Sequence, residues 1–179
     1  MPARHSFVPR LWLMTDERMG DALWPALERL PRGSGVVFRH YRLPRADRAA
    51  LYARVAKVAR RRGLVLLRAG KDRLGPWESG THGWSARDRS GRKQGRPGAH
   101  SGLHSVSVHN RVEALRAIRE KAGLVFVSPI FATRSHPGAR ALGRIGFAQL
   151  IRGIKAPVIA LGGMTERRAR TLRPAPIHG

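Results

Sequence analysis

Three stretches of the sequence end an apolar run in side chains that could bind an anion or move a proton. SVSVHN closes with His109 and Asn110, SPIFATRSH closes with a polar group at residues 133–136, and VIALGG closes with Gly162 and Gly163. Hydroxyl and guanidinium groups donate hydrogen bonds to phosphate oxygens, and glycine lets a phosphate approach backbone N–H groups. Histidine titrates near neutral pH, so it is a candidate for proton transfer. The pattern predicts a site for a phosphorylated small molecule.

The polar group after the second of these runs consists of Thr133, Arg134, Ser135 and His136. A Pro-Gly turn follows it and would fold these side chains over the mouth of a site. An ordinary solvated loop has the same composition, and paired glycines also suit a tight turn without any ligand. Both interpretations stay open at this level.

Alternation along SVSVHN separates two kinds of side chain. In an extended strand successive side chains point to opposite faces, so Ser105, Ser107 and His109 share one face and Val106 and Val108 the other. Two hydroxyls and an imidazole on one face are suited to proton transfer. The alternative is a histidine held by an ordinary hydrogen bond at a strand end.

Strand-like and helix-like segments alternate along the whole chain, which predicts a parallel sheet with helices outside it. We expect a small (β/α)₈ TIM barrel with a truncated or missing eighth strand, forming a single domain over residues 1–179. An open doubly wound sheet is the alternative, but no GxGxxG follows the first strand. The expected strands are residues 11–16, 34–43, 64–70, a short one within 75–85 that ends near 82–84, 103–110, 124–131 and 156–163. The expected helices are residues 17–30, 45–63, 111–123, 139–154 and from 165 onward.

Helix boundaries and strand ends refine this layout. Asp16 and Thr165 are expected N-caps, and Gly63 is an expected C-terminal stop. Active sites of such barrels lie at the carboxyl ends of the strands, which adds Arg39 and His82 to the candidates. Residues 87–102 are basic and glycine-rich and predict a flexible loop.

The composition is strongly basic, with 35 Lys and Arg against 11 Asp and Glu, a net charge of +24. Such a field attracts phosphorylated metabolites or nucleic acids. A basic nucleic-acid-binding module is a weaker alternative, because aromatic residues for base stacking make up only 6%. Cysteine is absent and no apolar run reaches the roughly 20 residues of a membrane span, so we expect a cytoplasmic protein. Without HExxH, CxxC, P-loop or GxSxG motifs, zinc proteolysis, P-loop hydrolysis and serine hydrolysis are poorly supported.

The motifs SVSVHN, SPIFATRSHPGARALG and PVIALGGMT, in this order, resemble the thiamine phosphate synthase/TenI family over residues 103–170. The resemblance implies a (β/α)₈ barrel of thiamine biosynthesis. Synthases of the family join a pyrimidine diphosphate to a thiazole phosphate with Mg²⁺ and release pyrophosphate, whereas TenI-type members tautomerise a thiazole carboxylate phosphate. By position, Thr133 and Gly163 would hold the thiazole phosphate, Ser107 would lie on the pyrimidine or pyrophosphate side, and His109 would transfer protons.

Departures from the family pattern concern the diphosphate and the metal. Of the Gln-x-Arg-x-Lys pattern after the second strand only Arg39 survives, and Arg68 stands near the place of an Asn-Asp pair after the third. Asp88 falls one residue out of step with a metal aspartate, and His136 replaces a lysine. The resemblance thus leaves open a synthase using Mg²⁺, a tautomerase without it, and a catalytically silent member. A homo-oligomer is also left open.

Overall fold

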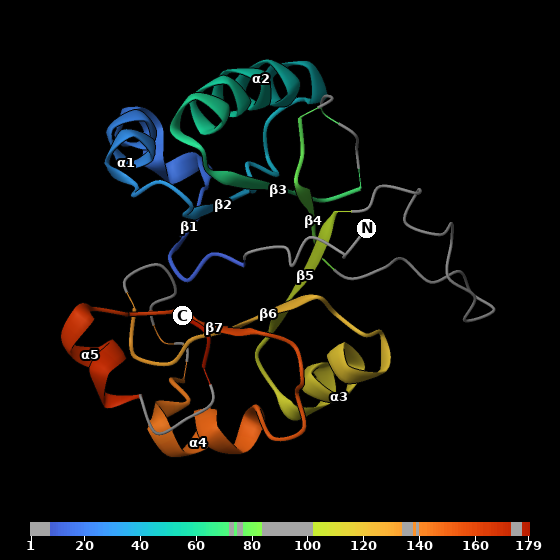
Figure 1. Ribbon diagram of the computed structural model, residues 1–179, viewed down its shortest axis with the longest axis vertical. Helices are drawn as coiled ribbons and strands as arrows, with labels where there is room; N and C mark the ends of the chain where they lie inside the picture. The colour runs from blue at the N-terminus through green and yellow to red at the C-terminus, as the bar shows by residue number, and fades with distance from the viewer. Residues whose placement is uncertain are drawn as a thin grey trace, which may run out of the picture. The chain divides into compact units, whose positions relative to one another are not determined.

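A computed structural model describes residues 8–71, 74, 77–83, 102–133, 138, 140–172 and 177–179. Within these residues, seven strands follow one another in the sheet in chain order, from β1 to β7, with helices between most of them (Figure 1). The chain divides into two compact units, Met1–Thr81 and His82–Gly179, which are described separately below. The expected α/β class with a parallel sheet is confirmed.

The first unit is a three-stranded parallel sheet with two helices on one side (Figure 1). Val36 and Phe38 of β2 are fully buried and pack with Leu23, Leu27 and the core-facing residues of the long helix. The elements are β1 (Trp12–Met14), the 3₁₀ helix η1 (Glu17–Ala22), α1 (Leu23–Arg29), β2 (Gly35–Phe38), α2 (Arg45–Arg62) and β3 (Val65–Ala69).

The helix α2 follows the periodicity of its sequence. Tyr52, Val55 and Ala59, at spacings of three and four residues, are buried against the sheet. Gly63 ends the helix in the left-handed conformation, at φ 64°, and donates its N–H to the carbonyls of Ala59 and Arg60. The expected C-terminal stop at Gly63 is confirmed.

Trp77 and Glu78, in the link from β3 to β4, contact α2 and β3 respectively. The Arg68 guanidinium at the end of β3 pairs with the Glu78 carboxylate at 2.6 Å, and both side chains are buried. The Tyr52 hydroxyl donates to the Trp77 carbonyl at 2.6 Å, and the Arg60 guanidinium stacks 4.5 Å from the Trp77 ring centroid. These contacts hold Trp77 against α2 and Glu78 against the end of β3.

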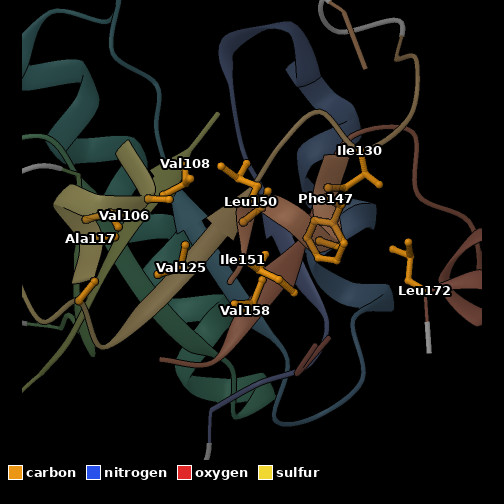
Figure 2. Packing of buried hydrophobic residues seen from close by; sticks show 14 residues of the cluster. Val106, Val108, Ala117, Val125, Ile130, Phe147, Leu150, Ile151, Val158 and Leu172 are labelled. Atoms are coloured by element: carbon orange, nitrogen blue, oxygen red, sulfur yellow. The ribbon is translucent and has the colours of Figure 1, made fainter. Parts of the chain in front are cut away.

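The second unit buries its core between a parallel sheet and the helices on one face of it (Figure 1). Val106, Val125 and Val158 from three strands meet Phe147 and Leu150 of α4 (Figure 2). The elements are β5 (Leu103–Val108), α3 (Arg111–Arg119), β6 (Leu124–Val127), α4 (Gly143–Leu150), β7 (Val158–Ala160) and α5 (Glu166–Thr171), and β4 (Gly80–His82) lies at the boundary between the units.

The place next to β7 is taken by residues 177–179. His178 donates its N–H to the Val158 carbonyl at 2.8 Å, and Ala160 donates to the Gly179 carbonyl at 2.9 Å. Among the described residues, these bonds extend the backbone hydrogen bonding of the sheet past β7.

Several elements are shorter than the sequence predicted, for local reasons. The strand expected over residues 34–43 ends at Phe38, because His40 adopts a left-handed φ of 35° that breaks the extended backbone. The helix expected over residues 111–123 ends at Arg119, two residues before Lys121 takes a φ of 53°. The helix expected over 139–154 is only Gly143–Leu150, because the N–H groups of Leu142 and Gly143 bond to the carbonyls of Pro129 and Ile130.

The basic segment 87–102 lies, except for Gly102, outside the described residues. In the described part of the chain, no helix has both the length and the apolar character needed to cross a membrane. The expectation of one domain over residues 1–179 stays a prediction.

Candidate functional site

The loop after β6 runs directly alongside the turn after β7. Ile130 donates its N–H to the Leu161 carbonyl at 2.9 Å, and Phe131 donates to the Gly162 carbonyl at 3.1 Å. Leu161 in turn donates to the Val127 carbonyl at 2.9 Å. Three backbone hydrogen bonds therefore join the end of β6 and the loop after it to the turn after β7.

Glycine is required at both positions of the turn. Gly162 and Gly163 have φ of 89° and 61°, in the left-handed region. A Cβ on Gly162 would lie 2.8 Å from the Pro129 Cα, and one on Gly163 would lie 2.4 Å from the Ala132 carbonyl oxygen. The close approach of the loop explains both glycines, and it places Thr133, the residue after Ala132, beside the turn.

Arg168 of α5 holds the same loop and turn together. Its Nη1 donates to the Gly163 carbonyl at 2.5 Å, and its guanidinium lies 4.9 Å from the centroid of the Phe131 ring. The Thr165 hydroxyl caps α5 by accepting the Arg168 N–H at 3.2 Å, which confirms the expected N-cap. A cation thus stands next to Gly163.

A second polar cluster lies at β4 and β5. Ser105 is fully buried and Ser107 partly buried, and both hydroxyls lie on the side of His82. Val106 and Val108 belong to the hydrophobic core (Figure 2). The alternation predicted for this strand is therefore confirmed up to Val108. His82 of β4 bridges the two hydroxyls, with its Nδ1 2.9 Å from the Ser105 Oγ and its Nε2 3.2 Å from the Ser107 Oγ.

His109 follows β5 and pairs with a carboxylate. Its Nδ1 lies 2.9 Å from Glu113 Oε2, which also accepts the His109 backbone N–H at 2.7 Å. The Asn110 side chain caps α3 by accepting the Glu113 N–H at 3.0 Å and so brings this carboxylate back toward the strand end. The His109 side chain is 50% exposed, so the imidazole is open to solvent and fixed on one side.

Arg39, in the first unit, is held by its neighbours in sequence and space. Its Nε donates to the Thr15 carbonyl at 2.8 Å, and its Nη2 pairs with Asp16 Oδ2 at 3.0 Å. The hydrogen bond from the Arg18 side chain, opposed by burial, lowers the pKa of Asp16 below its ordinary value. Asp16 also accepts the Arg18 N–H and thereby caps η1, as expected.

Arg134, Ser135, His136 and Asp88 lie outside the described residues. Among the described residues, no group of three or more His, Asp or Glu could hold a metal ion. The described part of the chain therefore supplies no all-protein cage for a metal ion, whereas Mg²⁺ at phosphate sites usually takes only one or two carboxylates besides the substrate.

A cavity of 240 Å³ lies on the helix side of the first unit, between α2 and the link to β4. Tyr52, Leu74 and Trp77 line it together with Lys57 and Arg60, and no residue expected to bind substrate is among its lining.

The strand ends define a protein of the α/β TIM-barrel class, with polar groups at the carboxyl ends of β5, β6 and β7. A family model described as thiamine monophosphate synthase matches residues 87–179. The chain belongs to this family.

Curated relatives agree with this membership. The chain is 37% identical to the thiamine-phosphate synthase of Chloroflexus aurantiacus over 78 residues, which are 43% of this chain and 36% of the relative. It is 30% identical to that of Pyrococcus furiosus over 74 residues, 41% of this chain and 36% of the relative. The aligned part thus spans only about a third of each relative's length.

Solved structures extend the likeness of the fold over nearly the whole chain. A thiamine phosphate pyrophosphorylase from Pyrococcus furiosus superposes with a TM-score of 0.69 at 19% identity, covering 94% of this chain and 82% of that one. A thiamine phosphate pyrophosphorylase from Bacteroides thetaiotaomicron gives 0.55 at 18% identity, covering 95% and 80%. The TIM-barrel-like α/β fold expected from the sequence is confirmed.

Two residues of this arrangement, Glu113 and Arg168, were not among the candidates named from the sequence, and His82 was named only as a strand-end residue. Glu113 and Arg168 sit in the first turns of helices, where the sequence alone signals only a charged helix surface. His82 ends a short strand, and its position at a strand end was the one signal available. Its partnership with Ser105 and Ser107 depends on strand register, which the sequence pattern does not determine.

Proposed function

We propose that this protein acts in thiamine biosynthesis by binding a thiazole phosphate, as a transferase of the thiamine-phosphate synthase type. The observation that carries the proposal is the close approach of Gly163 to Ala132, because Thr133, the residue after Ala132, then belongs to the loop beside the glycine turn after β7. Family membership and the names of the curated relatives support the same assignment. We place the enzyme in the cytoplasm.

The phosphate is proposed to bind between Thr133 and the turn. In this proposal the Thr133 hydroxyl donates to a phosphate oxygen, and the Gly163 backbone N–H donates to another, since glycine has no Cβ of its own to keep a phosphate away. Arg168, which is bonded to the Gly163 carbonyl, adds a positive charge beside the turn. The net charge of +24 draws the anionic substrate toward the protein.

The pyrimidine diphosphate is proposed to meet Ser107, whose hydroxyl donates to an anionic oxygen. We further propose that Arg134, Ser135, His136 and Gly162 contribute to substrate binding, and that Arg39 binds an anionic group in the first unit. Mg²⁺, when bound, would neutralise the leaving diphosphate. The described residues hold no cluster of three or more His, Asp or Glu for it, and the steps assigned to this chain are binding and orienting the substrates.

A second candidate, a TenI-like tautomerase, is favoured by the His109–Glu113 pair. Moving a double bond within a thiazole requires one group that accepts and returns a proton. The Glu113 carboxylate fixes His109 Nδ1 at 2.9 Å, leaving the other ring nitrogen of this half-exposed imidazole for the substrate. This chemistry requires a phosphate grip and a histidine but no diphosphate site.

One assay separates the two reactions. The protein is incubated with thiazole phosphate and pyrimidine diphosphate, with Mg²⁺ or with EDTA, and thiamine phosphate is quantified. Its formation supports the synthase. Conversion of the thiazole carboxylate phosphate tautomer, followed by NMR and lost in His109→Asn, supports the tautomerase instead. If the folded protein forms neither product, the proposed activity is overturned.

A further inference from the structure

We infer that His82 is a positioning residue that turns the Ser107 hydroxyl into a hydrogen-bond donor for an anionic oxygen. The inference rests on the proposed function, which assigns Ser107 to an anionic substrate group. It concerns a residue of β4 that is itself 7% exposed.

The geometry leaves the imidazole little freedom. Both ring nitrogens lie within hydrogen-bond distance of a serine hydroxyl, at 2.9 Å for Ser105 and 3.2 Å for Ser107. The edge of the ring packs against Phe126 of β6, with ring centroids 5.5 Å apart and planes at 73°. The neighbouring Gly83 N–H bonds to the Ser105 carbonyl at 2.9 Å, which ties the end of β4 to β5.

The two tautomers of neutral His82 give Ser107 opposite chemistry. With the proton on Nε2, the ring donates to the Ser107 Oγ, and the Ser107 O–H is free to donate to a ligand. With the proton on Nδ1, the ring donates to Ser105 and accepts from Ser107, so that Ser107 presents only lone pairs outward. Of the two tautomers, only the first lets Ser107 donate to an anionic oxygen and keep its hydrogen bond to His82.

Ser105 and Ser107 have different parts in this arrangement. Ser105 is fully buried and out of reach of a ligand, whereas Ser107 is partly exposed. Ser105 therefore serves as the inner anchor of the ring, and Ser107 as its outer partner. Through the two hydrogen bonds of His82, the orientation of the buried Ser105 hydroxyl determines the orientation of the Ser107 hydroxyl, which can contact substrate.

A matched pair of variants tests the inference, with inorganic pyrophosphate as the probe and calorimetry as the readout. His82→Gln keeps an amide near the position of Nε2, and His82→Asn keeps one near Nδ1. Loss of a hydrogen bond to a charged group weakens binding by about tenfold or more. We expect His82→Asn and Ser107→Ala each to weaken pyrophosphate binding by about tenfold. We expect the affinity of His82→Gln to stay within about threefold of wild type. Circular dichroism checks that each variant is folded.

A spectroscopic readout distinguishes positioning from a merely structural role. In ¹⁵N-histidine-labelled wild-type protein, pyrophosphate should move the His82 signals toward the pattern of a protonated Nε2. Equal weakening in both variants, unchanged binding in His82→Asn, or His82 signals that do not respond would overturn the inference. Absence of pyrophosphate binding by the wild type would also overturn it, whereas the proposed function would fail separately through absence of thiazole phosphate binding.

Discussion

Gly163 lies so close to Ala132 that a methyl group on the glycine would come within 2.4 Å of the Ala132 carbonyl oxygen. This contact joins the turn after β7 to the loop after β6, and it is reinforced by the Phe131 N–H bond to the Gly162 carbonyl at 3.1 Å. The loop that carries Thr133 is thereby fixed by the sheet's own backbone. A disturbance at Gly163 should reach the ligand through this loop.

Gly163→Ala should therefore weaken both folding and ligand binding. The new Cβ meets a carbonyl and the backbone is strained at φ 61°, which together should cost about 1–3 kcal/mol of unfolding free energy. Displacement of Thr133 should also reduce thiazole phosphate affinity. Urea denaturation and calorimetry measure the two effects.

Gly146→Ala is the matched control for that substitution. Gly146 lies inside α4, and a Cβ there would meet nothing closer than the Leu142 Cβ at 3.7 Å. Alanine should stabilise the helix by about 0.5–1 kcal/mol and leave ligand affinity unchanged. Equal destabilisation by both changes would contradict the importance of the Gly163–Ala132 contact.

Thr133→Val tests the phosphate grip without altering the shape of the side chain. Losing one hydroxyl donor to a charged phosphate should raise the Kd for thiazole phosphate about tenfold. Thr171→Val, at the exposed end of α5, should leave the Kd unchanged. Similar affinity in wild type and Thr133→Val would remove Thr133 from the proposed site.

The buried ion pair between Arg68 and Glu78 makes a prediction about stability. Glu78→Gln leaves the Arg68 guanidinium, whose side chain is 7% exposed, without its carboxylate, and should cost about 3–5 kcal/mol. The double change Arg68→Met with Glu78→Leu removes both charges and should recover most of that loss. Chemical denaturation decides the point, and a double variant as unstable as Glu78→Gln would contradict it.

His40 predicts a pH dependence of stability in the first unit. Burial lowers the pKa of His40 below its ordinary 6.5, partly offset by Glu17 and Asp16, while Arg48 and Arg39 lower it further. The unfolded chain then binds a proton more readily than the folded one, so the stability contribution is complete above pH 6.5 and is lost as the pH falls through 6.5 toward the lower folded value.

The change His40→Asn isolates that contribution, because asparagine tolerates the left-handed φ of 35° at this position. Wild-type unfolding free energy should fall more steeply between about pH 7 and pH 5 than that of His40→Asn. Parallel curves for the two proteins would assign the pH dependence to other groups.

Much of this fold follows from local sequence signals. The C-terminal stop at Gly63, the caps at Asp16 and Thr165, and the alternation of Ser105 with Val106 are local properties, and the structure confirms them. The predicted end of β2 was wrong, because His40 takes a left-handed backbone conformation that ends the strand early. The His40 ring is hydrogen-bonded to the Thr15 hydroxyl, 25 residues away, and a local pattern does not reveal such a partner.

The candidate site was less accessible to prediction for the same reason. Thr133 and Gly163 could be named from residue type and order, but their juxtaposition comes from the packing of one strand end on another. The bridge from His82 to two serines depends on the register between β4 and β5. Charged residues such as Arg168 are common in this chain, so sequence alone does not single out the one that reaches the turn.

The most direct test of the central claim is a calorimetric titration of the purified protein with thiazole phosphate. The account predicts saturable binding at a single site per chain, weakened in Thr133→Val and in Gly163→Ala and retained in Gly146→Ala. Absence of binding to the folded protein would contradict it, and would mean that the strand ends of this barrel-type fold serve a different ligand.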